Sequence, residues 1–165
     1  MGQYQVEMEF MFAAQQVDVL RIDQLVSRHT LEGKSRAPLL RDRLNGLFKG
    51  FIDLVFEHQG RYYVVDYKSN WLGSEAASYT EQNMGQAVLD HRYDLQYALY
   101  LLALHRQLRA RLPDYDYDRH IGGALFWFVR GVEAEGAGIW RDRPPRQLIE
   151  SLDRLFAGQV LEEIY

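Results

Sequence analysis

The chain has 165 residues, of which 47% are hydrophobic and 25% charged, and its formal net charge is −4. This is the balance of one folded domain, and it excludes wholesale disorder. Without cysteine, the chain cannot form disulfides, thiolate metal sites or a cysteine nucleophile. We see neither a signal peptide nor an apolar run of membrane-spanning length, so we expect a cytoplasmic protein. The acidic balance disfavours a protein that coats nucleic acid by charge alone.

The first third of the chain contains one clear pattern and one weak one. Apolar and polar residues alternate from residue 4 to residue 12, which predicts a half-buried strand. The segment Asp18–Arg28 has a weak helical pattern. The polar and basic stretch Thr30–Asn45 contains Pro38, and we expect it to be a loop.

Two strands joined by a tight turn follow this loop. The segments Leu47–Phe56 and Arg61–Lys68 are rich in β-branched and aromatic residues, and Glu57–Gly60 between them is typical of a hairpin turn. Further along, Ser78 and Glu81 have the spacing of a capping box, which predicts that a short helix begins there.

The last third of the chain predicts two helices and one strand. Asp90–Leu112 is expected to be a long helix that ends at Pro113, and its core stripe is expected to comprise Leu95, Leu99, Leu102 and Leu108. Ile121–Val129 is a continuous apolar run, which indicates a strand buried on both faces. A final helix should follow Pro144-Pro145. This order of elements predicts an α/β fold with a mixed sheet flanked by helices.

Three charged residues of the hairpin are expected to share one face. If the hairpin is symmetric about Gln59-Gly60, Asp53 lies directly opposite Asp66, with Cβ atoms about 4.5–5.5 Å apart. Lys68 is two residues beyond Asp66 and therefore points to the same face.

Two opposed carboxylates among apolar neighbours require a positive charge between them, because desolvation strengthens their repulsion. Lys68 is one candidate for that charge, and a hard divalent cation such as Mg²⁺ is the other. A bound Mg²⁺ could activate water and neutralise charge at a phosphorus centre. The alternative is structural, since Asp-x-Lys on a strand is often a solvated salt pair.

Two polar residues of the predicted long helix could brace such a site. Gln96 and Tyr100 are four residues apart and share one helix face. The alternative is that they only border the core. The five histidines form no ligand pair, and the chain lacks both a phosphate-binding glycine loop and a Gly-x-Ser-x-Gly motif, so a P-loop ATPase or a serine hydrolase is a poor fit.

These motifs resemble those of the PD-(D/E)xK nucleases. The matching strings are Gly50-Phe51-Ile52-Asp53, Asp66-Tyr67-Lys68-Ser69-Asn70 and Gln96-x-x-x-Tyr100. More narrowly, the chain is similar to the family of C-terminal nuclease domains of RecB, the β subunit of the bacterial RecBCD helicase–nuclease (exodeoxyribonuclease V). The likeness runs from about Gln5 to near Pro144.

The resemblance implies a restriction-endonuclease-like core and a Mg²⁺ site. Asp53, Asp66 and the backbone carbonyl of Tyr67 would bind the metal, and Lys68 would be the catalytic lysine. Gln96 and Tyr100 would support the site and contact DNA. The implied function is Mg²⁺-dependent endo- and exonuclease cleavage of mainly single-stranded DNA in double-strand-break repair and recombination. RecC and RecD would be partner subunits, and RecA a further partner.

One family feature has no counterpart in this sequence. In the family, a histidine on a helix before the first strand also binds the metal, and none of the five histidines occupies that position. We therefore expect residues 1–165 to be a single nuclease domain cut from a larger helicase–nuclease subunit, without its first helix. The alternative function is that of a non-catalytic interaction fragment, used in RecA loading or subunit docking.

Overall fold

The computed structural model describes residues 4–39 and 43–158, and within them five strands form one mixed sheet. The strands lie in chain order: β1 (Tyr4–Asp18), β2 (Arg43–His58), β3 (Arg61–Lys68), β4 (Ile121–Phe128) and β5 (Ile139–Asp142). Among the pairs of these described strands, only β3–β4 is parallel. The helices are α1 (Val19–His29), α2 (Glu81–Asp90), α3 (Tyr93–Arg111), α4 (Tyr117–His120) and α5 (Arg146–Phe156). Short 3₁₀ turns lie at Leu31–Gly33, Ala76–Ser78 and Val129–Gly131. The expected α/β class is confirmed.

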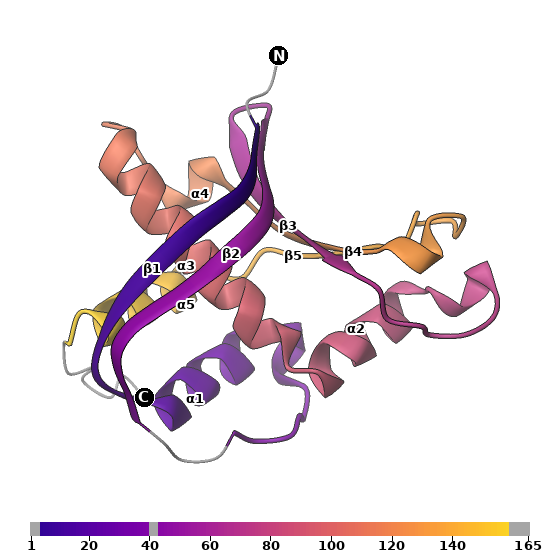
Figure 1. Cartoon of the computed structure of the whole chain (residues 1–165), viewed down its shortest axis with the longest axis horizontal. Helices are drawn as coiled ribbons and strands as arrows, with labels where there is room; N and C mark the ends of the chain where they lie inside the picture. The colour runs from indigo at the N-terminus through magenta and orange to yellow at the C-terminus, as the bar shows by residue number, and fades with distance from the viewer. Residues whose placement is uncertain (1–3, 40–42, 159–165) are drawn as a thin grey trace.

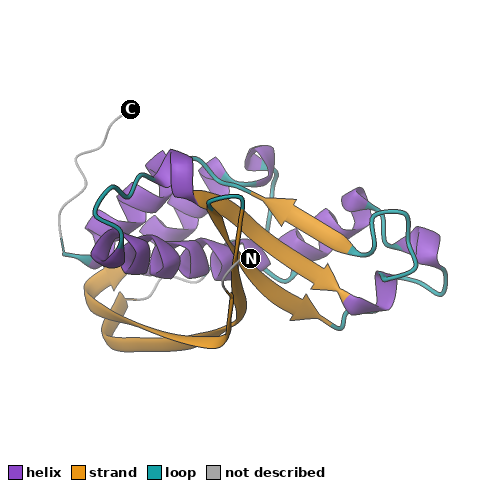
Figure 2. Ribbon diagram, turned by 90° about the horizontal axis from the view of Figure 1, so that it is seen from above, coloured by secondary structure: helices purple, strands orange, loops and turns teal. Residues whose placement is uncertain are grey.

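The longest helix, α3, lies at the centre of the fold. It contacts α1, α2 and α5, and it also packs on β1, β3 and β4. Figure 2 shows the main helices gathered on one side of the strands. Tyr97, Leu101 and Leu104 of α3 are buried in the core cluster. No helix of the described residues is long and apolar enough to cross a membrane.

The hairpin register agrees with the expected symmetry. The β2–β3 pairs run from His58↔Arg61 to Leu54↔Val65. Both residues of the turn have left-handed backbone, with φ 52° at Gln59 and 79° at Gly60. The β2–β3 ladder ends at Leu54, whereas β2 stays paired with β1 along most of its length. The β1–β2 ribbon thus curves away from the shorter strands, as Figure 1 shows.

The first strand and the loop before β2 differ in part from the prediction. Met8 and Phe12 are buried, but Tyr4 and Val6 are exposed. A left-handed φ of 54° at Glu7 interrupts the regular alternation. The predicted loop Thr30–Asn45 ends too late, because pairing with β1 draws the chain into β2 from Arg43 onward.

The predicted long helix Asp90–Leu112 is wrong at its start. Arg92 has φ 53° and separates α2 from α3. The capping box at Ser78 is also wrong, because Thr80 caps α2 by accepting a hydrogen bond from the N–H of Asn83. Of the expected core stripe, Leu102 and Leu108 are buried, whereas Leu95 and Leu99 are only partly so. The sequence patterns also missed α4 and β5. The predicted strand at Ile121 and the final helix are confirmed, but β4 ends at Phe128, before the exposed Val129, and Leu125 and Trp127 on one face of it are only partly buried.

Candidate active site

Asp53 lies where β2 leaves β3. The last backbone pair is Leu54↔Val65, so the next position in register would oppose Asp53 to Asp66. At this position the side chain of Asp53, rather than its backbone, bonds to β3: Asp53 Oδ2 accepts a hydrogen bond from the N–H of Tyr67 at 3.0 Å. The carboxylate of Asp53 is thereby held beside β3 in place of a backbone acceptor.

A glycine three residues before Asp53 makes room for an aromatic ring. A Cβ at Gly50 would come within 2.5 Å of the Phe10 ring, so the ring lies directly over this position. The Phe10 ring meets the Tyr100 ring edge-on at 5.6 Å between centroids. The Gly-Phe-Ile-Asp string therefore contributes packing as well as a carboxylate.

Asp66 and Lys68 form a buried ion pair on β3. Their exposed fractions are 7% and 8%, and Lys68 Nζ lies 2.5 Å from Asp66 Oδ2. Lys68 Nζ also donates to Gln96 Oε1 of α3 at 2.6 Å. The ammonium group sits 3.7 Å from the centroid of the Tyr93 ring, a cation–π distance. The Phe126 ring lies on the lysine as well, 4.9 Å from Nζ to its centroid, so Lys68 is held by one carboxylate, one amide and two rings.

The electrostatics of the cluster favour a further cation. Burial raises the pKa of the Asp66 carboxyl, the Asp53 charge adds to this effect, and Lys68 opposes it. Burial and the charge of Asp66 raise the pKa of Tyr100 to about 12. Both shifts show that negative charge is costly here, so a divalent ion between Asp53 and Asp66 would offset this cost.

The structure brings the expected helix residues to the same place. Gln96 Nε2 donates to Tyr100 Oη at 2.8 Å while Gln96 Oε1 holds Lys68. Tyr67 differs, because its side chain is 47% exposed and packs against Trp127 on the other face of β3. Its N–H points to Asp53, and within a strand the carbonyl of a residue faces the same neighbour as its N–H. The Tyr67 carbonyl is therefore directed to the Asp53 side of β3.

The start of α3 is fixed by buried charges that sequence patterns did not reveal. Asp94 is fully buried and bonds Arg36 at 2.7 Å and Arg92 at 3.1 Å. Arg92 also reaches Asp23 of α1 at 2.6 Å. Breaking such buried pairs typically costs about 3–5 kcal/mol. This network secures the helix turn that carries Tyr93, which is a partner of Lys68. The local clustering of charged residues near residue 92 is the one sequence signal that could have indicated this network.

The donor set fits a hard divalent cation. Two carboxylates and a nearby carbonyl are oxygen ligands, which Mg²⁺ prefers and completes with water and phosphate oxygens. Within residues 4–39 and 43–158, no group of three or more His, Asp or Glu is placed to hold a metal. An ion here would therefore depend on Asp53, Asp66 and ligands beyond those side chains.

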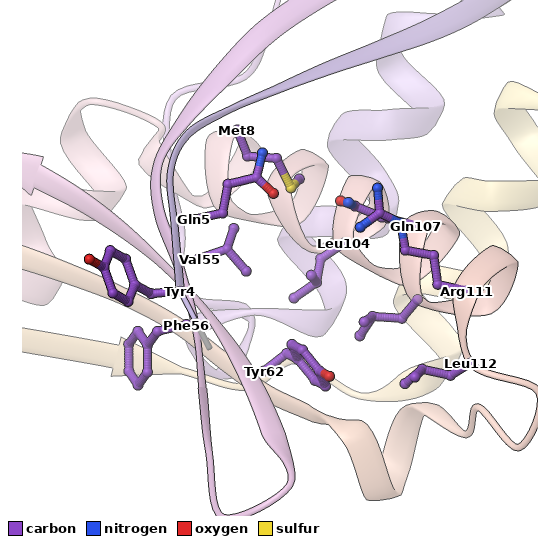
Figure 3. A pocket seen from close by; sticks show the side chains of 11 residues that line it. Tyr4, Gln5, Met8, Val55, Phe56, Tyr62, Leu104, Gln107, Arg111 and Leu112 are labelled. Carbon is purple, nitrogen blue, oxygen red and sulfur yellow. The ribbon is translucent and has the colours of Figure 1, made fainter. Parts of the chain in front are cut away.

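A separate pocket lies at the other end of α3. Figure 3 shows it between the β1–β2 ribbon and the last turns of α3, with Leu104 and Arg111 on the helix side and Met8 and Val55 on the strand side. Its volume is about 320 Å³, and it contains none of the expected site residues. The candidate site of Asp53, Asp66 and Lys68 is therefore separate from this pocket.

Comparison with known proteins gives one family and consistent relatives. The family model described as "PD-(D/E)XK nuclease superfamily" matches residues 4–164. The protein named "RecBCD enzyme subunit RecB" from Escherichia coli is 49% identical over 162 residues, which cover 96% of this chain and 14% of that protein. Its namesake from Haemophilus influenzae is 45% identical, covering 78% of this chain and 11% of the relative. The one from Mycobacterium tuberculosis is 42% identical, covering 68% and 11%. The chain thus spans about one seventh or less of these relatives.

Proposed function

Because the chain belongs to the PD-(D/E)XK nuclease superfamily, we propose that it is a Mg²⁺-dependent nuclease domain that cleaves DNA, mainly single strands, during double-strand-break repair and recombination. The observation that carries this proposal is the cluster of Asp53, Asp66 and Lys68 at the point where the β2–β3 ladder ends. The lysine is buried and is bonded to one of two adjacent carboxylates. This arrangement fits phosphodiester hydrolysis better than it fits a solvated salt pair.

The proposed roles follow from these contacts. Asp53, Asp66 and the Tyr67 carbonyl would hold the ion. When bound, Mg²⁺ lowers the pKa of the water that it coordinates and neutralises charge on the phosphate. Lys68 Nζ is aimed into the same space and would donate to a phosphate oxygen as charge develops there. Gln96, itself bonded to Tyr100, holds Lys68 in this orientation.

The relatives suggest where such a domain works. Since they are named as subunits of the RecBCD enzyme, we propose that this chain is a single nuclease domain of a longer RecB-type subunit. In that setting, RecC and RecD would be its partner subunits, RecA a further contact, and the cytoplasm its location. A histidine from a preceding segment would complete the metal site.

Mg²⁺-dependent degradation of linear single-stranded DNA tests the proposal. We expect the chain joined to the preceding, histidine-bearing segment of its subunit to cleave a labelled oligonucleotide with Mg²⁺ and not with EDTA, and we expect Asp66→Ala to abolish cleavage. Lys49→Ala is the matched control, because its ion pair with Glu9 lies on the surface.

Two outcomes would count against the proposal. Cleavage that survives in Asp66→Ala or in Lys68→Ala would place the chemistry elsewhere. Absence of cleavage by every form of the chain, with or without the preceding segment of its subunit, would favour the non-catalytic interaction role instead.

A further inference from the structure

Trp71 is an exposed indole on a firmly held loop. It follows the end of β3 by three residues, and 67% of it is exposed. The Tyr79 hydroxyl holds both neighbours of Trp71, since it donates to the carbonyl of Asn70 and accepts from the N–H of Leu72, each at 3.2 Å. The backbone on either side of the indole is thus tied to one tyrosine, although the ring itself faces solvent.

The same loop is connected to the candidate active site. The Asn70 side chain pairs with the hydroxyl of Tyr93 at 3.2 Å, and the Tyr93 ring lies 3.7 Å below Lys68 Nζ. Trp71 is three residues beyond Lys68, and three residues span at most about 10 Å, which is the length of about three stacked nucleotides at 3.4 Å each. A strand of DNA cut beside Lys68 and running along this loop would therefore reach Trp71 within about three nucleotides.

The surroundings of Trp71 suit a neutral, flat group. Trp71 and Arg130 border a hollow of about 360 Å³, and Arg130 Nε donates to the carbonyl of Ser69 at 2.8 Å. The carboxylates of Glu75 and Glu133 line the same hollow and disfavour a phosphate inside it. In Figure 1, this loop between β3 and α2 lies beside the turn that follows β4.

We propose that Trp71 is a stacking subsite for one unpaired nucleobase, about three nucleotides from the cleaved phosphate, with the DNA backbone passing on the Arg130 side. The proposal rests on the proposed nuclease function and adds the feature that selects single strands. An exposed aromatic face stacks on any base, whereas the bases of a duplex are already stacked on each other.

Binding without cleavage tests the subsite. In EDTA, we expect oligo(dT) to quench tryptophan fluorescence, because Trp71 is far more exposed than Trp140 and Trp127. We expect Trp71→Ala to weaken binding about five- to hundredfold, the usual loss for one stacked base, and Trp71→Phe to retain most of the affinity. Tyr4→Ala is the matched control, since Tyr4 is 74% exposed and lies on β1, away from the loop.

An abasic scan locates the subsite on the strand. Removing single bases from the oligonucleotide in turn should weaken wild-type binding most at one position, and Trp71→Ala should lose this position dependence. Equal affinity of wild type and Trp71→Ala, or no oligo(dT) binding at all, would overturn the subsite.

Cleavage assays keep the two proposals apart. If Trp71→Ala binds like wild type while Asp66→Ala alone loses cleavage, the subsite is wrong and the nuclease stands. If Trp71→Ala loses binding while no form of the chain cleaves, the subsite stands and the catalytic assignment fails.

Discussion

Asp53 Oδ2 accepts the backbone N–H of Tyr67 at 3.0 Å, so a metal-ligand candidate on β2 is anchored by β3 itself. This bond spans the point where the β2–β3 ladder has ended at Leu54↔Val65. It sets the carboxylate of Asp53 beside that of Asp66 and keeps the two from separating despite their like charge.

Substitutions at Asp53 separate this anchor from the charge. Asp53→Asn keeps an oxygen that can accept from Tyr67, whereas Asp53→Ala leaves the N–H without that partner. Both remove the same negative charge, so the difference between them isolates the hydrogen bond. We expect Asp53→Ala to be less stable than Asp53→Asn by about 0.5–1.5 kcal/mol in urea unfolding, and both to lose cleavage. Equal stability of the two variants would show that the bond contributes nothing.

Removing the Lys68 ammonium should tighten metal binding while abolishing cleavage. Lys68 Nζ lies 2.5 Å from Asp66 Oδ2 and competes electrostatically with any cation there. A unit charge at such a distance is worth a few kcal/mol even at a high effective dielectric constant. We expect Lys68→Met to raise Mg²⁺ affinity at least about tenfold by calorimetry. Lys49→Met, at an exposed pair, should leave the affinity unchanged, and a weaker affinity in Lys68→Met would contradict the proposed ligand set.

Asp142 should make the fold less stable as the pH rises. Burial raises the pKa of this carboxyl, which accepts a hydrogen bond from Tyr97 at 2.5 Å. In the unfolded chain, an aspartate has its ordinary pKa of about 3.9. Above that pH, Asp142 of the folded chain retains a proton that the unfolded chain releases, so the free energy of unfolding falls as the pH rises from the unfolded to the folded pKa. Asp142→Asn lacks this dependence. Urea unfolding between about pH 4 and pH 7 should therefore show the wild type losing stability relative to Asp142→Asn, and parallel curves would refute the expectation.

Gly50→Ala should destabilise the fold through a single clash. The added Cβ would lie within 2.5 Å of the Phe10 ring, and overpacking of this kind costs about 1–3 kcal/mol. The double variant with Phe10→Leu should recover part of the loss, because the smaller side chain vacates the space. Gly136→Ala, with nothing within 4 Å of its Cβ, is the control in thermal unfolding. An additive double variant would rule out the clash as the cause.

Local sequence features were enough to place three of the candidate site residues together. The turn at Gln59-Gly60 fixes the hairpin register, and the two-residue period of a strand then puts Asp66 and Lys68 on one face. These are short-range rules, which do not depend on the rest of the chain.

The remaining contacts of the candidate site depend on tertiary packing, so they could not be predicted from the sequence. The bond from Lys68 to Gln96 exists only because α3 docks on β3, and no spacing in the sequence encodes that docking. The break at Arg92 follows from its buried bonds to Asp94 and Asp23, which lie on different helices. Thr80 displaced Ser78 as the helix cap because both residue types can cap and geometry decides between them.

The position of both aspartates on one hairpin also bears on the order of folding. Only twelve residues separate Asp53 from Asp66, so their strands can pair after a short loop closure. Gln96 reaches Lys68 only after α3 has docked on the sheet. The repulsion between the carboxylates therefore opposes the first step of assembly, before Lys68 is locked in place. A divalent cation in the refolding buffer should consequently raise the folding rate constant, and not merely slow unfolding of the finished domain.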